Sequence, residues 1–270
     1  MAFVIAYLII MFFFYFSTAM MGKLFGFDAQ VYYYGVKFQL GRHKWTTANV
    51  FWIWSFGTLF TVLLGAICTY LYNYFKEKVA LGNLIAVWGA VIAFSIAAAQ
   101  GLLPVLDSGN DHSPFYTNLS IVFNYWALPI PVLYIICIVF LILLAFVSTN
   151  ISRSFLSFSY SFSKVNKRER KRKYYFETVI IPYILASGLL LLFFQETYRF
   201  IGFDMQNLVY LVVIGAALVF SMFIINISDI KSDDVLRYKN LQQLSAALFV
   251  IMMILLVFLS VTWQGFYLPF

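Results

Sequence analysis

The sequence predicts an all-α polytopic membrane protein with about seven transmembrane helices. Hydrophobic residues make up 63% of the 270 residues, against roughly 45–50% in soluble domains. Charged residues make up only 11%, against about 25% in soluble domains. A soluble chain of this length needs far more charge to cover its surface, so its main solvent is expected to be lipid. The third observation is a series of apolar runs separated by charged or turn-forming residues.

Seven of these runs are long enough to cross a bilayer. We expect spans at 1–22, 47–74, 80–106, 119–147, 179–195, 207–227 and 244–263, all within a single integral membrane domain over residues 1–270. Pro129 and Pro131 lie inside the fourth run. Because proline removes backbone donors, these two residues are expected to kink that helix or to mark its start. The first run lacks the basic start of a signal peptide, so we interpret it as a retained helix.

Positive charges predict the orientation of the chain. The second, fourth and sixth loops carry 13 of the 18 Lys and Arg residues, and the first, third and fifth loops carry 5. Cytoplasmic loops are the ones that collect such charges in membrane proteins. We therefore expect a cytoplasmic N-terminus, an external C-terminus and a basic cytoplasmic loop at 151–178. The expected location is the bacterial cytoplasmic (inner) membrane.

Seven of the positive charges gather within ten residues of the fourth loop. They are Lys164, Lys167, Arg168, Arg170, Lys171, Arg172 and Lys173. We expect this run to contact anionic lipid headgroups, since each Lys or Arg near the membrane surface contributes about 1 kcal/mol to such binding. The alternative interpretation is a contact to RNA, such as a ribosome docked on a translocation channel.

A segment near residues 30–45 is expected to form one short β-strand or a hairpin. Polar and apolar β-formers alternate from Gln30 to Leu40, and Gly41–Lys44 is expected to form the turn or end. One face of this strand would carry Tyr32, Tyr34, Val36 and Phe38. These residues could pair with an extended client segment by edge addition. An interfacial aromatic loop is the alternative.

Small residues recur along one face of the third run. They are Gly89, Ala93, Ala97 and Gly101. Such spacing lets helix backbones approach closely in lipid. We expect this stripe to pack against a helix of the same chain, and a partner protein is the alternative.

Few side chains inside the spans could carry chemistry. Buried Asp, Glu, His or Lys residues mark ion and proton pathways in membranes, and the spans contain almost none. Gln100, Asn124 and Asp107 are polar groups that could line a cavity in a transporter or a lipid-handling protein. Cys68 and Cys137 lie in apolar runs without a CxxC motif, so no thiolate metal site is expected.

The third loop carries a resemblance to a known family. The stretch LLPVLDSGN, residues 102–110, resembles the LLP-x-x-x-LDGG motif of the intramembrane zinc metalloproteases, the site-2 protease family. In that family the Asp of the motif ligates zinc, a role that the resemblance would give to Asp107. Met21–Gly26 is similar to the AAKLFG segment of the family. Val31–Arg42 stands where the family has a membrane-associated β-hairpin, and Asn49–Gly65 stands where it has its second helix. The resemblance covers roughly residues 14–112.

The zinc-binding motif of the family is missing. Its HExxH aligns with Phe14–Thr18, and its AGP aligns with Phe56–Thr58. HExxH works because two His side chains at i and i+4 share a helix face and hold the metal. Phe and Thr side chains supply no imidazole nitrogen, so we expect no metal, no cofactor and no catalytic residue. The family arrangement would also place the first and third loops in the cytoplasm, whereas the charge count places them outside.

These patterns favour a non-catalytic multi-pass subunit or scaffold of a membrane complex. The resemblance implies a pseudoprotease that binds partner or client proteins. Its expected partners are the lipid bilayer, anionic lipids and other membrane proteins. A transporter or lipid-handling protein is the alternative, and an active metalloprotease with unorthodox ligands is a third interpretation.

Overall fold

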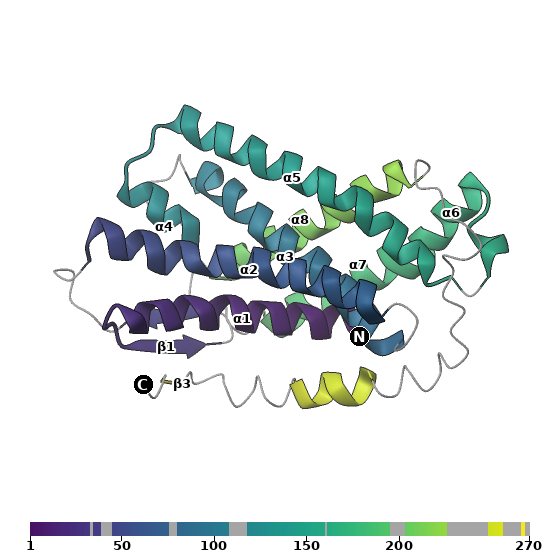
Figure 1. The fold of residues 1–270 in the computed structure, drawn as a ribbon, viewed down its shortest axis with the longest axis horizontal. Helices are drawn as coiled ribbons and strands as arrows, with labels where there is room; N and C mark the ends of the chain where they lie inside the picture. The colour runs from purple at the N-terminus through teal and green to yellow at the C-terminus, as the bar shows by residue number, and fades with distance from the viewer. Residues whose placement is uncertain are drawn as a thin grey trace.

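Figure 1 shows a bundle of long helices with a small sheet beside it. The computed structural model describes residues 1–32, 35–38, 45–75, 80–107, 118–159, 161–194, 203–225, 248–255 and 266–267. Helices dominate these residues, so the expected all-α class is confirmed. Within this described part, six helices are long and apolar enough to cross a membrane.

The first three helices follow the expected ranges closely. They are α1 (Ala2–Leu24), α2 (Thr47–Phe75) and α3 (Ala80–Asp107). Each has more than the roughly 20 residues that an apolar helix needs to cross a bilayer. In a long, nearly uninterrupted apolar run, a helix satisfies the backbone donors and acceptors within the run itself.

The fourth expected span, 119–147, is not a single helix. A short helix and a long one replace it, namely α4 (Asn118–Tyr125) and α5 (Ile130–Ser157). Between them Ala127 has a φ of 48°, and Pro129 precedes α5 in an extended conformation. Pro131 falls in the first turn of α5, where a missing N–H costs nothing because first-turn donors have no partner within the helix. The prolines therefore mark the start of a helix.

Helix α5 also continues past residue 147, where the apolar run ends. Its serine hydroxyls find partners within the helix, because they donate to carbonyls about one turn earlier. Ser148 donates to the Leu144 carbonyl at 2.8 Å, and Ser157 donates to the Ser154 carbonyl at 2.7 Å. These bonds satisfy the hydroxyls inside the helix.

The segment 151–178, expected as a loop, is largely helical. After α5 it forms the 3₁₀ turn η2 (Phe162–Lys164), α6 (Arg168–Tyr175) and the π-helical segment η3 (Phe176–Ile180). The latter continues into α7 (Ile181–Phe194). Lys, Arg and Glu are good helix formers, and Glu169 in the first turn of α6 complements the helix dipole. The fifth long helix therefore begins near residue 168 instead of residue 179.

The last described segments are a long helix, a short helical segment and a short strand. The helix is α8 (Phe203–Ile224), close to the expected 207–227. Of the seventh expected span, 244–263, the described residues 248–255 are helical. The rest of that span lies outside the described residues.

A three-stranded antiparallel sheet lies at one end of the bundle (Figure 1). Its strands are β1 (Ala29–Tyr32), β2 (Gly35–Phe38) and β3 (Phe266–Tyr267), in the order β2-β1-β3. Val31 pairs with Val36 on one side and with Phe266 on the other. The chain thus forms a hairpin where a single strand over residues 30–40 was one expectation. A two-residue alternation is the same in one long strand and in both arms of a hairpin, so it could not locate the reversal.

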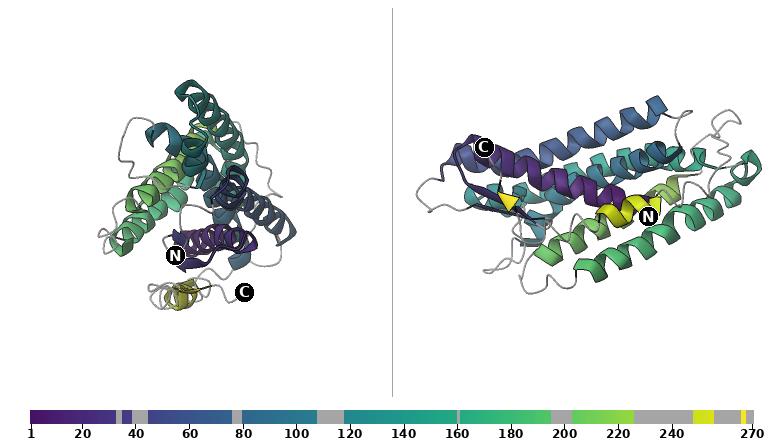
Figure 2. Two further views of the ribbon diagram at one scale, coloured as in Figure 1. Left: turned by 90° about the vertical axis from the view of Figure 1, so that its left-hand side faces the viewer. Right: turned by 90° about the horizontal axis from the view of Figure 1, so that it is seen from below.

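Helix α1 lies between two groups of helices. Figure 2 shows α2 on one side of it and the α7–α8 pair on the other. Phe3 packs edge-on against Trp88 of α3 and Tyr183 of α7, with ring centroids 5.1 and 5.3 Å away. Phe14 is fully buried. Helix α1 therefore packs against both α3 and α7 and joins these two helices through its own side chains.

Candidate functional site

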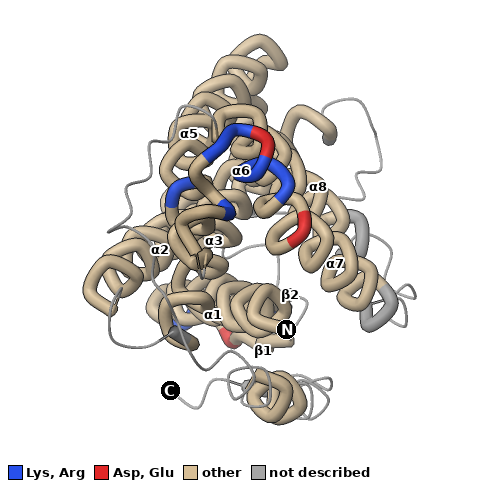
Figure 3. Tube along the Cα trace, turned by 90° about the vertical axis from the view of Figure 1, so that its right-hand side faces the viewer, with Lys and Arg blue, Asp and Glu red and all other residues tan. Residues whose placement is uncertain are grey.

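A basic pocket of about 420 Å³ lies at the end of the bundle where α6 begins. It is formed by η2, α6 and the first turn of η3. Its lining residues are Ser163, Lys164, Arg170, Lys173, Tyr174 and Glu177. Figure 3 shows Lys and Arg gathered along α6 at this end of the molecule. A concave site with several positive groups is suited to an anionic headgroup or phosphate.

Helix geometry decides which basic residues enter this pocket. Arg170, Lys173, Tyr174 and Glu177 are spaced at i, i+3, i+4 and i+7, so they share one face. The 3₁₀ turn η2 brings Lys164 to the same place. Three of the seven basic residues expected to contact anions therefore line one pocket.

The remaining four basic residues point elsewhere. Lys167 and Arg168 are exposed, Arg172 is half-buried, and none of the three lines the pocket. Lys171 has only 9% of its surface exposed. Consecutive helical residues are rotated by about 100°, so a continuous basic run must cover all faces of a helix. The basic run expected to contact anions therefore presents its charges on more than one face of the helix.

Two side chains that line the pocket interact with neighbouring groups. Arg170 donates through Nη1 to the Ser163 carbonyl at 3.0 Å, which joins α6 to η2. Lys173 Nζ lies 3.9 Å from the Glu177 carboxylate, and both side chains are largely exposed. This contact contributes little stability in water. Lys173 is therefore readily available to an anion that competes with Glu177.

The small-residue stripe of α3 lies within the bundle. A Cβ atom added at Gly89 would stand 2.9 Å from Cys68 Sγ of α2, and one added at Gly101 would stand 2.5 Å from the Phe140 ring of α5. Ala93 and Ala97 are buried between them. The stripe thus meets two neighbouring helices of the same chain.

A buried polar cluster links α1, α3, α4 and α8. Tyr7 donates to Asn207 Oδ1 at 2.9 Å, and Gln100 Nε2 donates to the Tyr210 hydroxyl at 2.5 Å. The same hydroxyl also accepts from Gln206. The backbone N–H of Leu119 donates to Gln100 Oε1 at 3.3 Å, which anchors the start of α4. Bonds of this kind satisfy groups that would otherwise be costly to bury.

The polar residues suggested for a transport cavity are not brought together in the described structure. Gln100 is fully buried in the cluster, whereas Asn124 is exposed near the end of α4. Asp107 is the last residue of α3, and its side chain lies outside the described residues. Sequence reasoning found Gln100 but missed Tyr7 and Tyr210, because nothing distinguishes them among 19 tyrosines.

The positions that align with HExxH form part of the packed core. Phe14 lies against Tyr210 with ring centroids 6.4 Å apart, and the Thr18 hydroxyl donates to the Phe14 carbonyl at 3.1 Å. No group of three His, Cys, Asp or Glu side chains able to hold a metal occurs among the described residues.

The residues expected on one strand face are divided between two strands. Tyr32 belongs to β1, while Val36 and Phe38 belong to β2. Tyr34 lies outside the described residues. Phe38 packs against Trp45 and against Trp54 of α2, with centroid distances of 5.7 and 5.4 Å. Its ring therefore attaches the hairpin to the bundle.

No family model, curated protein or solved structure matches this chain.

Proposed function

We propose that this chain is a multi-pass integral membrane protein that serves as a non-catalytic subunit or scaffold for partner or client proteins. Six long apolar helices support insertion into a membrane. So do exposed apolar side chains on their outer faces, such as Leu63, Ile138 and Leu185. The proposed location is the bacterial cytoplasmic membrane, with 244–263 as a seventh span.

One observation carries the binding role. Strand β1 pairs on one side with its hairpin partner β2 and on the other side with Phe266–Tyr267, a segment distant in the sequence. The sheet thus accepts an extended segment by edge addition. In the order β2-β1-β3, strand β2 has a neighbour on one side only among the described strands. A partner segment in extended conformation can add there through main-chain hydrogen bonds.

The family resemblance supports the same role. In residues 14–112 the hairpin stands where site-2 proteases have a membrane-associated β-hairpin, while the HExxH positions carry Phe14, Tyr15 and Thr18. Phe14 and Tyr15 are buried aromatic side chains. A pseudoprotease that keeps the hairpin and lacks the metal ligands is the form that we propose.

Photo-crosslinking at the edge strand tests this proposal. Lys37 is the exposed residue of β2, so benzoylphenylalanine placed there should yield one dominant protein adduct in cells. The adduct should survive mild extraction in detergent. Val36→Pro should reduce it strongly, because proline removes a main-chain donor from the edge strand to which the partner segment would add.

A matched position separates specific pairing from chance collision in the membrane. Leu185 of α7 is 70% exposed, and the same crosslinker there should give only weak, heterogeneous adducts. Equal adducts at Lys37 and Leu185, together with a monodisperse monomer after extraction, would refute the scaffold role.

A further inference from the structure

A second pocket lies between α2, α3 and α5 and shares no lining residue with the basic pocket. Its volume is about 500 Å³, within the roughly 300–1,000 Å³ that is typical of small-molecule sites. Two of the helices that form it carry exposed apolar residues along their length, such as Leu63 of α2 and Ile142 of α5. We call this pocket the lateral groove.

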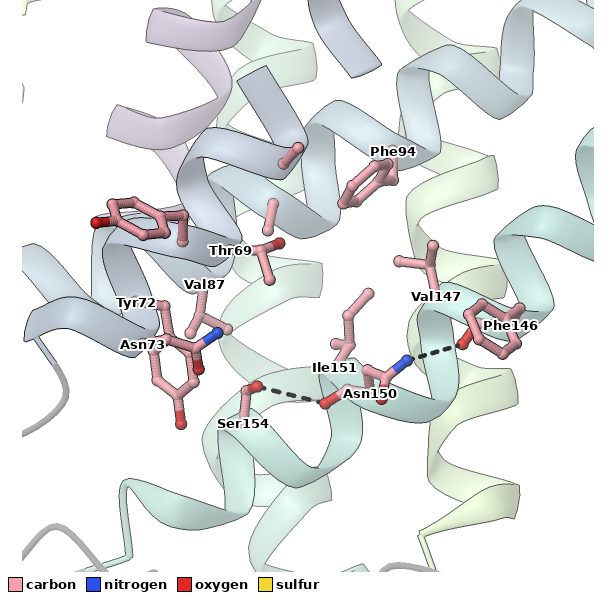
Figure 4. Close-up of a pocket in the computed structure, with 13 residues that line it drawn as sticks. Thr69, Tyr72, Asn73, Val87, Phe94, Phe146, Val147, Asn150, Ile151 and Ser154 are labelled. Atoms are coloured by element: carbon pink, nitrogen blue, oxygen red, sulfur yellow. Dashed lines mark hydrogen bonds between the residues drawn. The ribbon is translucent and has the colours of Figure 1, made fainter. Parts of the chain in front are cut away.

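The lateral groove changes from apolar to polar along its length. Ala66, Phe94 and Val147 line the end nearer the middle of the long helices. The opposite end is lined by Asn73, Asn150 and Ser154 (Figure 4). Helices α2 and α5 end just beyond, at Phe75 and Ser157. If these helices span a membrane, the polar end lies at headgroup depth and the apolar end lies among acyl chains.

The polar end retains capacity for hydrogen bonds to a ligand. Asn150 Nδ2 donates to the Phe146 carbonyl at 3.4 Å, and Ser154 Oγ donates to the Asn150 carbonyl at 3.3 Å. Both bonds are long. An amide carries two donor hydrogens and an acceptor oxygen, so Asn150 can offer further bonds.

Positive charge lies at this same end. Arg153 is exposed and directly precedes Ser154 in α5. The basic helix α6 follows α5 in the chain and packs near its end (Figure 1). Tyr72 of α2 is hydrogen-bonded to Ser157 at 2.8 Å, which places the end of α2 at the end of α5 as well.

We propose that the lateral groove binds an anionic phospholipid. One acyl chain lies between α2 and α5 against Phe94 and Val147, and the headgroup lies beside Asn73, Ser154 and Arg153. An apolar tail and a negative head match the groove at both of its ends. This site goes beyond the scaffold role and rests only on the proposed insertion into a membrane.

Photoactivatable lipid tests the proposal on the purified full chain. The chain is reconstituted in phosphatidylcholine vesicles with a trace of phosphatidylglycerol that carries a diazirine in its acyl chain. Crosslinked peptides should concentrate on the groove-lining parts of α2 and α5. The same diazirine on phosphatidylcholine should label the groove about fivefold less, which is the effect of one near-surface charge. Arg153→Gln should lower labelling by phosphatidylglycerol by a similar factor, because it removes one such charge.

Two alanine variants provide a matched comparison. Ala66 and Ala216 are both exposed residues on long apolar helices, but only Ala66 lines the groove. Ala66→Trp should fill the groove and lower its labelling by about tenfold. Ala216→Trp, on α8, should leave it unchanged. Labelling of the outer face of α8 in both variants shows that the bundle is folded and embedded in lipid.

Several results would overturn the site. Labelling spread evenly over the outer helix faces and insensitive to Ala66→Trp would show that no specific site exists. Equal labelling by the two headgroups would refute the anionic selectivity. An unlabelled groove beside a labelled α8 would show that lipid does not enter the groove. Absence of labelling everywhere would instead refute membrane insertion, and with it the proposed function.

Discussion

At the scale of single residues, the Tyr210 hydroxyl is the meeting point of two glutamine side chains. Gln100 approaches it from α3 and Gln206 from within α8. All three residues are buried, so water cannot replace a lost partner. A buried donor left without a partner costs more than the bond itself contributes. The hydroxyl therefore matters more for stability than its size indicates.

Tyr210→Phe is expected to destabilise the fold by about 1–3 kcal/mol, because it leaves two buried amides short of an acceptor. Thermal unfolding of the purified protein in detergent measures this change. Tyr125→Phe is the control, since Tyr125 is 48% exposed and its loss should stay within about 0.5 kcal/mol. Equal melting temperatures for the two variants would show that the cluster contributes no stability.

Glycines of the bundle differ sharply in the space around them. A Cβ at Gly101 would stand 2.5 Å from the Phe140 ring, whereas one at Gly188 of α7 would meet nothing within 4 Å. Gly101→Ala is thus expected to cost about 1–3 kcal/mol through overpacking of α3 against α5. Gly188→Ala should be neutral or should stabilise by up to about 1 kcal/mol through helix propensity. The same thermal assay decides, and a neutral Gly101→Ala would show that α3 and α5 do not pack closely.

At the scale of elements, uniform apolar runs were predictable and polar helices were not. Helices α1, α2 and α3 follow the expected ranges. A helix satisfies the backbone donors and acceptors of a long apolar run within the run itself. The last turns of α5 and all of α6 are polar, and a hydropathy pattern assigns such residues to loops. The helicity of α6 agrees with the high helix propensity of Lys, Arg and Glu, which hydropathy does not measure. In α5 the serine hydroxyls are satisfied by carbonyls of the same helix.

The candidate site was predictable in composition but not in geometry. The basic run was evident, yet only contact between η2 and α6 shows that Lys164 joins Arg170 and Lys173. The i, i+3, i+4, i+7 spacing could have identified the lining face had the helix been expected. The lateral groove had no sequence signal, because its residues come from three separate helices and resemble any lipid-facing positions.

Only some of the basic residues of α6 line the pocket, so two pairs of charge-removing substitutions can be compared. Arg170→Gln with Lys173→Gln removes two charges that line the basic pocket, and Lys167→Gln with Arg168→Gln removes two exposed charges that do not. Each near-surface charge contributes about 1 kcal/mol to anionic lipid binding. The first pair should therefore weaken phosphatidylglycerol retention in native mass spectrometry by tenfold or more, roughly the effect of two such charges. The second pair should lower retention clearly less. Equal losses of retention would show that the pocket has no special role and that the lipid binds to the basic surface in general.

At the scale of the whole molecule, the hairpin and the basic helix lie at opposite ends of the bundle. Figure 1 places β1 at the end where α1 finishes and α6 at the other end. Positive charge collects on the cytoplasmic side of membrane proteins. The proposed orientation then puts the basic pocket and the polar end of the lateral groove in the cytoplasmic leaflet. The same proposed orientation puts the hairpin on the external side, where an extracytoplasmic segment of a partner could reach it.

Cysteine accessibility in intact cells tests this orientation. Cys68 and Cys137 are first replaced by Ala, and single cysteines are then placed at two exposed positions, Asn166 before α6 and Lys37 in β2. Val165 next to Asn166 is fully buried and would be protected whatever the orientation, so Asn166 is the informative site. A membrane-impermeant maleimide should label Lys37→Cys at once, and it should label Asn166→Cys only after the membrane is permeabilised.

The reverse pattern would invert the orientation and place the hairpin in the cytoplasm, as the site-2 protease arrangement requires. Labelling of both positions in intact cells would mean that the two ends of the bundle are not on opposite sides of a membrane.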